Sequence, residues 1–117
     1  MNTRDIINYE FALDDIETII AVLTVADKAF LSADIADYSD SEKREALGFI
    51  HSALQRFKDF HDKLTYNELL ATGIAFDFAD RILNGYVSVD SASLEICNKY
   101  YASIRRLSPV FFKAFFE

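Results

Sequence analysis

Residues that interrupt helices are scarce in this chain. Its 117 residues include three glycines and one proline. A many-stranded β fold needs turn residues at short intervals, so these few breakers favour long helices. Apolar residues recur at i+3 and i+4 spacing along most of the sequence, which indicates amphipathic helices. Hydrophobic residues make up 51% of the chain, too many for a disordered protein. We therefore expect one all-α domain over residues 1–117.

The periodicity predicts a single-domain bundle of four main helices plus a short C-terminal helix. They are expected at about residues 3–31, 40–64, 66–83, 91–107 and 110–116. The first helix is either continuous or broken near residues 11–13. The third helix, about 66–83, is apolar over most of its circumference, which is typical of a helix surrounded by others. We expect it to be central.

Local signals place several of these helix ends. Residues 39–42 (SDSE) and 65–68 (TYNE) have the form of capping boxes, which begin helices. Asn84 and Gly85 form a strong C-terminal stop. Ser108 followed by Pro109 suits an N-cap with proline at the first helical position. These signals separate the second, third and fifth helices from the segments that precede them.

Negative charge is confined to one part of the chain. The formal net charge is −7. Residues 1–42 hold ten acids and two bases, which gives −8, whereas residues 43–117 hold nine acids and ten bases, which gives +1. An acidic surface repels nucleic acid and anionic membranes and attracts a basic protein. We therefore expect a basic protein partner and no direct contact with nucleic acid or a membrane.

The sequence also bears on the compartment. A single cysteine, Cys97, allows no disulfide within the chain. The first residues lack the pattern of a signal peptide, and the early uncharged run over residues 18–26 is too short to span a membrane. We expect a cytoplasmic protein.

Residue types that often carry chemistry are present without the partners that catalysis or metal binding needs. His51 and His61 lie about 280° apart around one helix, so they do not share a face. The acidic loop residues lack the glycine and the alternating oxygens of a calcium loop. Cys97 is expected to be an inert residue on an apolar helix face. We predict no catalytic residue, no metal site and no cofactor.

These features favour a non-catalytic inhibitor of another protein. An immunity or antitoxin-type protein, or a phage-encoded one, neutralises a basic toxin, nuclease or other nucleic-acid-binding protein by covering its basic surface. Steered association makes such binding fast. The contact is expected on the first helix and the loop after it, with Tyr38 as an aromatic anchor. The expected partner-binding residues are Glu10, Asp14, Glu17, Asp34, Asp37, Tyr38 and Asp40.

Two other functions remain open. The first is a structural or regulatory module that forms homodimers through the phenylalanine-rich C-terminus, because exposed apolar patches mark interfaces. The residues of that patch are Phe111, Phe112, Phe115 and Phe116. The second is a small-ligand or enzymatic site near Tyr66, Asp77 and Asp80, although Asp77 and Arg81 also have the spacing of an i,i+4 ion pair.

Overall fold

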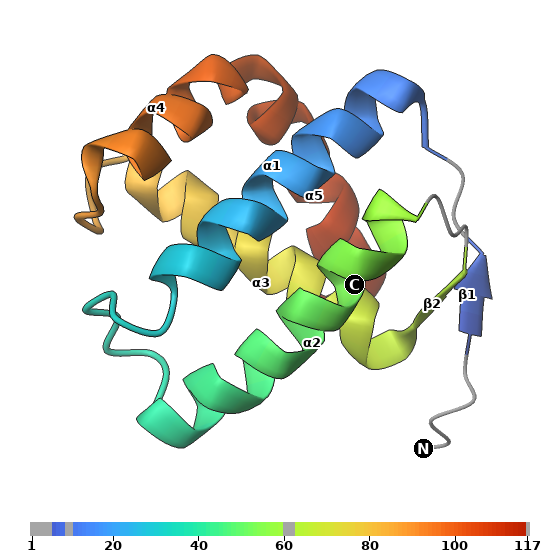
Figure 1. The fold of residues 1–117 in the computed structure, drawn as a ribbon, viewed down its shortest axis with the longest axis horizontal. Coiled ribbons are helices and arrows are strands. Elements are labelled where there is room, and N and C mark those ends of the chain that lie inside the picture. Colours follow the sequence, from blue (N-terminus) through green and yellow to red (C-terminus); the bar gives the residue numbers. More distant parts are fainter. Residues whose placement is uncertain (1–5, 9–10, 60–62, 117) are drawn as a thin grey trace.

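Helices dominate the fold (Figure 1). A computed structural model describes residues 6–8, 11–59 and 63–116, with side chains described over 11–59 and 63–111. The elements are β1 (Ile6–Asn8), α1 (Leu13–Ala29), α2 (Asp40–Lys58), β2 (Lys63–Thr65), α3 (Tyr66–Leu83), α4 (Ser91–Lys99) and α5 (Tyr101–Phe116). The expected all-α bundle is confirmed, with two short strands added to it.

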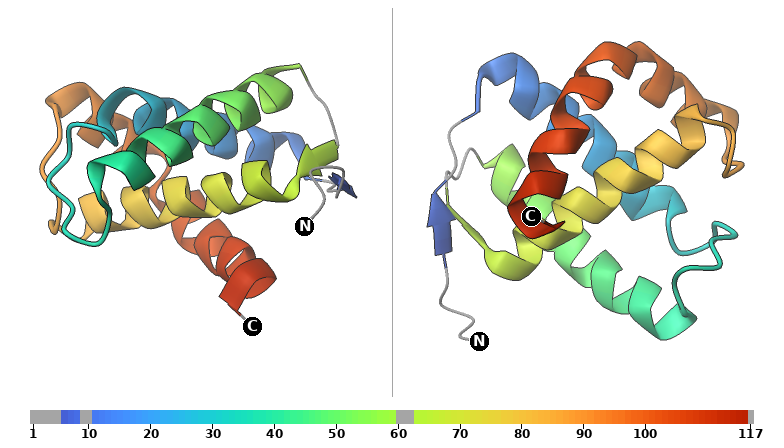
Figure 2. Two further views of the ribbon diagram at one scale, coloured as in Figure 1. Left: turned by 90° about the horizontal axis from the view of Figure 1, so that it is seen from below. Right: turned by 180° about the vertical axis from the view of Figure 1, so that it is seen from behind.

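The centre of the bundle is α3, as its apolar circumference predicts. It packs against α1, α2, α4 and α5. In Figures 1 and 2, α3 lies between α5 on one side and α1 with α2 on the other. The left view of Figure 2 shows α2 and α3 side by side and antiparallel. Their exposed edges therefore form one continuous surface of the bundle.

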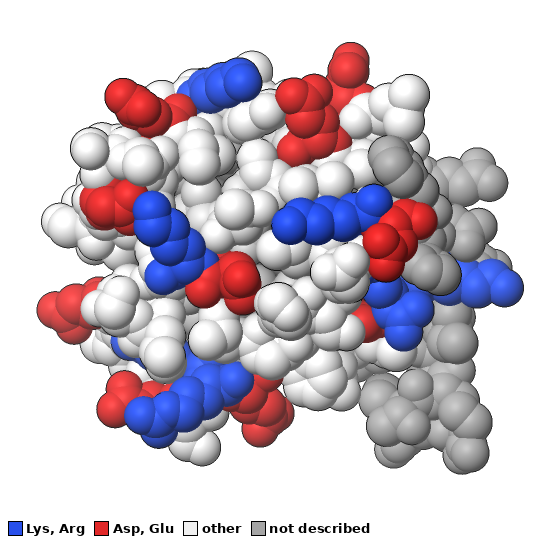
Figure 3. All heavy atoms as spheres, in the orientation of Figure 1, with Lys and Arg blue, Asp and Glu red and all other residues white. Residues whose placement is uncertain are grey.

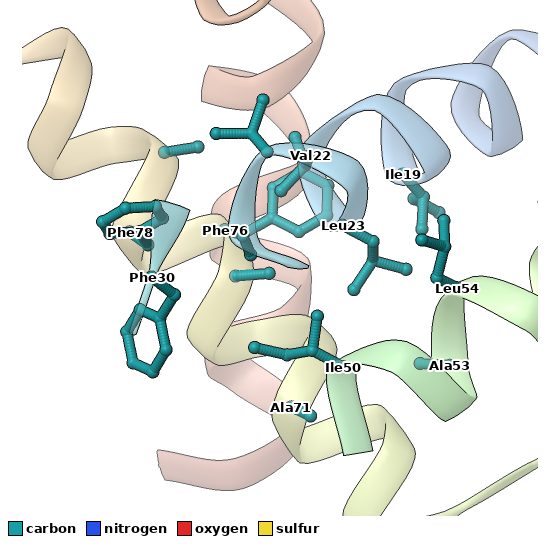
Figure 4. Packing of buried hydrophobic residues seen from close by; sticks show 14 of the residues in the cluster. Ile19, Val22, Leu23, Phe30, Ile50, Ala53, Leu54, Ala71, Phe76 and Phe78 are labelled. Carbon is teal, nitrogen blue, oxygen red and sulfur yellow. The ribbon is translucent and has the colours of Figure 1, made fainter. Parts of the chain in front are cut away.

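Aromatic and branched side chains from several helices fill the core. Phe76 of α3 stacks on Phe111 of α5, with ring centroids 4.8 Å apart. Phe78 of α3 meets Phe30 edge-on at 5.3 Å. Ile19 of α1 points towards Leu54 of α2, which closes the α1–α2 side (Figure 4). All these side chains are buried or nearly so. Interlocking rings of this kind fix how the helices pack as well as burying apolar area.

The expected first helix begins too early. Residues 6–8 form β1 instead, and α1 begins at Leu13. The strand pairs antiparallel with β2, with Ile7 opposite Leu64. Two adjacent isoleucines have branched side chains that suit a strand. The expected helix is therefore wrong over residues 6–8, and α1 begins at the place where the alternative put a break, near residues 11–13. Residues 3–5, 9 and 10 lie outside the described ones.

The expected second helix runs too far. It ends at Lys58, and Leu64 lies in β2 rather than in a last helical turn. Leu64 is nonetheless buried, so its match to the helical spacing was coincidental. The N-cap role of Thr65 requires an extended backbone there, and its φ and ψ of −71° and 161° are extended. Phe60 and His61 lie outside the described residues.

The boundary between the last two helices also moves. The break lies at Tyr100, not at Leu107, and α5 runs through Pro109. The hydroxyl of Tyr100 donates to the Glu17 carboxylate of α1 at 2.8 Å, which ties the break to α1. Pro109 is exposed to solvent and lies within α5 rather than at its first position. The expected N-cap at Ser108 is therefore wrong. The Ser108 hydroxyl instead donates back to the carbonyl of Ile104 at 2.8 Å.

Both capping boxes are confirmed. The Ser39 side chain accepts from the Glu42 N–H and Glu42 accepts from the Ser39 N–H, at the start of α2. Thr65 and Glu68 make the same reciprocal pair at the start of α3. Each box satisfies two backbone groups that a helix end would leave unpaired.

Candidate functional site

The fold places acids from the first part of the chain beside bases from the later part. Asp15 of α1 pairs with Arg106 of α5 at 2.5 Å. Asp27 lies 3.6 Å from His51, and Asp37 pairs with Arg81 at 2.7 Å. Figure 3 shows acidic and basic side chains interspersed over the face it presents. The separation of charge along the sequence is therefore partly cancelled in space.

The acids that we expected to bind from the first helix are unevenly placed. Asp14 is exposed and forms no salt bridge with a described residue, although its charge acts on nearby Arg106 of α5. Glu17 accepts the hydrogen bond from Tyr100, which raises the pKa of that tyrosine. Glu10 lies outside the described residues. Only Asp14 is thus left as an unpaired acid among the described candidates on α1.

Unpaired acids are more concentrated at the loop between α1 and α2 and at the first turns of α2. Asp34, Asp40 and Glu45 are exposed and form no ion pair with a described residue. Tyr38 is half-buried in the same loop, with its ring 5.4 Å from that of Phe30. The loop members of the expected partner-binding set therefore lie close together along the chain, beside an aromatic side chain.

Three contacts hold this loop against the bundle. The buried ammonium of Lys43 donates to the Ala33 carbonyl at 2.5 Å. Asp37 accepts from Arg81 of α3. The capping box of Ser39 fixes where the loop ends. The acidic loop is therefore positioned by the core-facing side of α2 and by α3.

A groove lies between the first turns of α2 and the first half of α3. Its volume is about 190 Å³, and its floor and walls are mainly apolar. Two carboxylates, those of Glu42 and Glu45, line it as well. The full lining is Tyr38, Glu42, Glu45, Ala46, Phe49, Asn67, Leu70, Ala71 and Ile74.

An ion-pair cluster neighbours the Tyr38 end of the groove. The guanidinium of Arg81 binds Asp37 at 2.7 Å and Asp77 at 2.9 Å. The hydrogen bond from Arg81 lowers the pKa of Asp37, whereas burial raises the pKa of Asp77. Burial, followed by the nearby charge of Asp77, raises the pKa of Tyr38. Tyr38 therefore remains a neutral phenol facing an acidic environment.

The groove and this cluster together are acidic. Their carboxylates are those of Asp37, Glu42, Glu45 and Asp77, and their cation is Arg81. Four carboxylates against one guanidinium leave a net charge of −3. Of the other bases on the first turns of α2, Lys43 is buried and Arg44 lies on the opposite side of the helix from Glu42 and Phe49, by helical spacing.

A second polar cluster fastens α2 to α3 farther along. Glu68 is 2% exposed and accepts hydrogen bonds from Ser52, from the Arg56 side chain at 2.7 Å and from the Thr65 N–H at 2.9 Å. Burial alone would raise the pKa of Glu68, but these hydrogen bonds outweigh it and the pKa is lowered. The cluster thereby joins α2 to the start of α3.

The described residues also bear on three other features, namely a reactive cysteine, a metal site and a membrane-spanning helix. Cys97 is buried, and burial raises its thiol pKa to about 11, which disfavours the reactive thiolate. The part of the chain that the structure describes holds no group of three metal-ligating side chains. Over the same residues, no helix has both the length and the apolar character needed to cross a membrane.

The structure separates the residues of the small-ligand alternative. Tyr66 begins α3 and Asp77 lies eleven residues later, which is about 16 Å along the helix. The i,i+4 ion pair of Asp77 and Arg81 is confirmed, and Asp80 is bound by Arg105 at 2.6 Å. Each of these carboxylates already has an arginine partner.

The homodimer alternative loses one of its residues. Phe111 is 1% exposed and stacks on Phe76 and, at 5.9 Å, on Phe11. It is therefore part of the core, not of a surface available to a second copy. The side chains of Phe112, Phe115 and Phe116 lie outside the described ones.

Sequence reasoning missed the groove. Phe49 and Ile74 pack on the core, yet both are only partly buried and also line the groove. The signal was present as Glu42, Glu45 and Phe49 at i+3 and i+4 spacing on α2. What the periodicity could not reveal is that α3 leaves this side of α2 incompletely covered.

Compared with protein families, with curated proteins and with solved structures, the chain matches none of them.

Proposed function

We propose that this protein is a non-catalytic binder of a basic protein, and that binding blocks the partner's basic surface. The observation that carries the proposal is that exposed carboxylates without an ion pair to any described residue recur along the loop and the first turns of α2. Asp34, Asp40 and Glu45 have no ion pair with a described residue, whereas acids such as Asp15 and Asp37 are matched within the fold. Unmatched charge on one surface steers an oppositely charged partner.

A toxin or nuclease fits this role because its active site or nucleic-acid channel is basic. An inhibitor that covers such a surface needs rapid association, which electrostatic steering supplies at about 10⁸ M⁻¹s⁻¹ or faster. The loop acids Asp34 and Asp40, with Tyr38 between them, are the proposed centre of the contact, and Asp37, which already pairs with Arg81, lies beside them. Asp14 and Glu17 on α1 are proposed as peripheral acids.

The experiment compares three forms of the protein as bait for capture from cells. The wild type is compared with Asp34→Asn/Asp40→Asn and with Asp59→Asn/Glu95→Gln, which changes the same charge at other exposed positions. The proposal predicts a net-basic partner that is captured at low salt, lost with the loop variant and retained with the control. A partner that binds all three forms equally would place the contact elsewhere.

A further inference from the structure

The groove between α2 and α3 combines two properties that the loop acids alone do not have. Its lining includes four partly buried apolar side chains, Tyr38, Phe49, Leu70 and Ile74, next to two exposed carboxylates. Three of these apolar side chains also pack on the core, whereas Leu70 is not among the residues that do. Leu70 therefore contributes mainly to the wall of the groove.

The volume limits what can enter. Sites for cofactors and drug-sized ligands span about 300–1,000 Å³, and a cavity of about 150 Å³ holds one benzene molecule. At about 190 Å³, this groove accommodates a single large side chain and little more. An anchor residue from another protein fits it better than a cofactor or a free metabolite does.

The charge limits which protein can supply that side chain. Glu42 and Glu45 lie on the lining and the cluster of Asp37, Asp77 and Arg81 lies beside it, so the net charge here is −3. A second copy of this chain carries −7 itself and would be repelled. A segment rich in lysine and arginine would be attracted, and its contacts with the rim would offset the desolvation of the carboxylates.

We infer that the α2–α3 groove binds a lysine- or arginine-rich segment of the partner and receives one Leu- or Phe-sized side chain from it. This inference rests on the proposed function and specifies its recognition element. The apolar side chain lies against Phe49, Leu70 and Ile74, and the flanking cations face Glu42 and Glu45. Such a pairing of a central anchor with a charged rim is typical of protein interfaces.

The test uses a short, fluorescein-labelled, lysine-rich peptide with one central phenylalanine, measured by fluorescence anisotropy. Two matched peptides replace the phenylalanine by alanine or the lysines by glutamates. We expect the phenylalanine peptide to bind about tenfold more tightly than the alanine peptide, because it buries one additional ring. We expect no binding of the glutamate peptide.

Matched protein variants locate the binding. Leu70→Gln should weaken binding of the phenylalanine peptide by at least about fivefold, since it makes the wall of the groove polar. Leu94→Gln, at an exposed position on α4, should leave this binding unchanged. Glu45→Lys should weaken the binding of both lysine-rich peptides, and Glu95→Lys should leave their binding unchanged. Circular dichroism and thermal midpoints verify that each variant is folded.

The outcomes separate this inference from the proposed function. If both lysine-rich peptides bind equally and only Glu45→Lys weakens them, the groove does not take an anchor, yet the acidic contact stands. If the glutamate peptide binds as well as the lysine-rich phenylalanine peptide, the inference that the groove selects a basic segment is wrong. If no lysine-rich peptide binds, or if the control variants weaken binding as much as the groove variants, both proposals are wrong.

Discussion

The carboxylate of Asp37 accepts a hydrogen bond from the guanidinium of Arg81 at 2.7 Å, across 44 residues of sequence. This contact lowers the pKa of Asp37. The substitution Arg81→Met should therefore raise the pKa of Asp37 towards its ordinary value of 3.8. An NMR pH titration of the Asp37 carboxyl measures this pKa. Arg44→Met removes an exposed arginine that has no ion pair with a described residue, and it should leave the titration unchanged. An unaltered pKa in Arg81→Met would show that the pair does not form in solution.

The two capping boxes should differ greatly in their contribution to stability. Glu68 is buried and also binds Arg56 and Ser52, whereas Glu42 is exposed and serves the cap. Glu68→Gln should lower the free energy of unfolding by about 2 kcal/mol, the scale of hydrogen bonds to a charged group. Glu42→Gln should have a much smaller effect. Urea unfolding at neutral pH measures the free energy of unfolding of both variants. Equal losses of stability would refute the structural role of Glu68.

The same carboxylate should make stability depend on pH. The pKa of Glu68 is lower in the folded protein than the ordinary 4.5, so the folded state binds fewer protons there than the unfolded state. Its contribution is fully present above about pH 4.5 and is lost as the pH falls through the folded value. The stability difference between wild type and Glu68→Gln should therefore narrow in acid. A difference that stays constant from pH 7 to pH 3 would contradict this linkage.

Lys43 should hold the acidic loop in place. Lys43 is 6% exposed, and its ammonium donates to the carbonyl of Ala33. Lys43→Met leaves that buried carbonyl without its donor, a loss of about 1–2 kcal/mol, and should speed hydrogen exchange over residues 31–39. Arg44→Met, one residue later on the exposed side, should leave both stability and exchange unchanged. Equal exchange in the two variants would mean that Lys43 does not anchor the loop.

Phe111 should act through the core and not through self-association. Phe111→Ala removes a ring that stacks on Phe76 and should lower the free energy of unfolding by about 3–5 kcal/mol. Val110→Ala, at the neighbouring exposed position, should cost less than about 1 kcal/mol. Thermal unfolding with light scattering makes the comparison. A stable Phe111→Ala variant that differs only in oligomeric state would contradict the core assignment.

Features of the fold that depend on local chemistry were predictable from the sequence. The start of α3 follows from Thr65 and Glu68, and its end follows from Asn84 and Gly85, because caps and stops act within a few residues. The break at Tyr100 was not predictable, since no glycine or proline marks it and its contact is with Glu17 of α1. β1 was likewise missed because a strand of three residues depends on its distant partner.

The candidate site was predictable only in part. Composition identified the acidic loop with Asp34, Asp37 and Asp40, and the sequence suggested Tyr38 as an aromatic anchor. It could not show that Asp15 and Asp37 are matched by arginines from later helices, because ion pairs over such separations depend on helix packing. The structure therefore shifts the proposed contact away from α1, towards the first turns of α2 and the groove.

The most direct test of this account is an NMR map of the binding of hexalysine at low salt. A small cation samples the negative surface of the protein whatever the identity of the natural partner. We predict that amide shifts concentrate in residues 31–49 and in the facing residues 67–77 of α3, and that they fade as salt is added. Shifts centred on Asp14 and Glu17 of α1, or spread evenly over all exposed acids, would contradict the claim that the acidic surface around α2 and α3 is the site of binding.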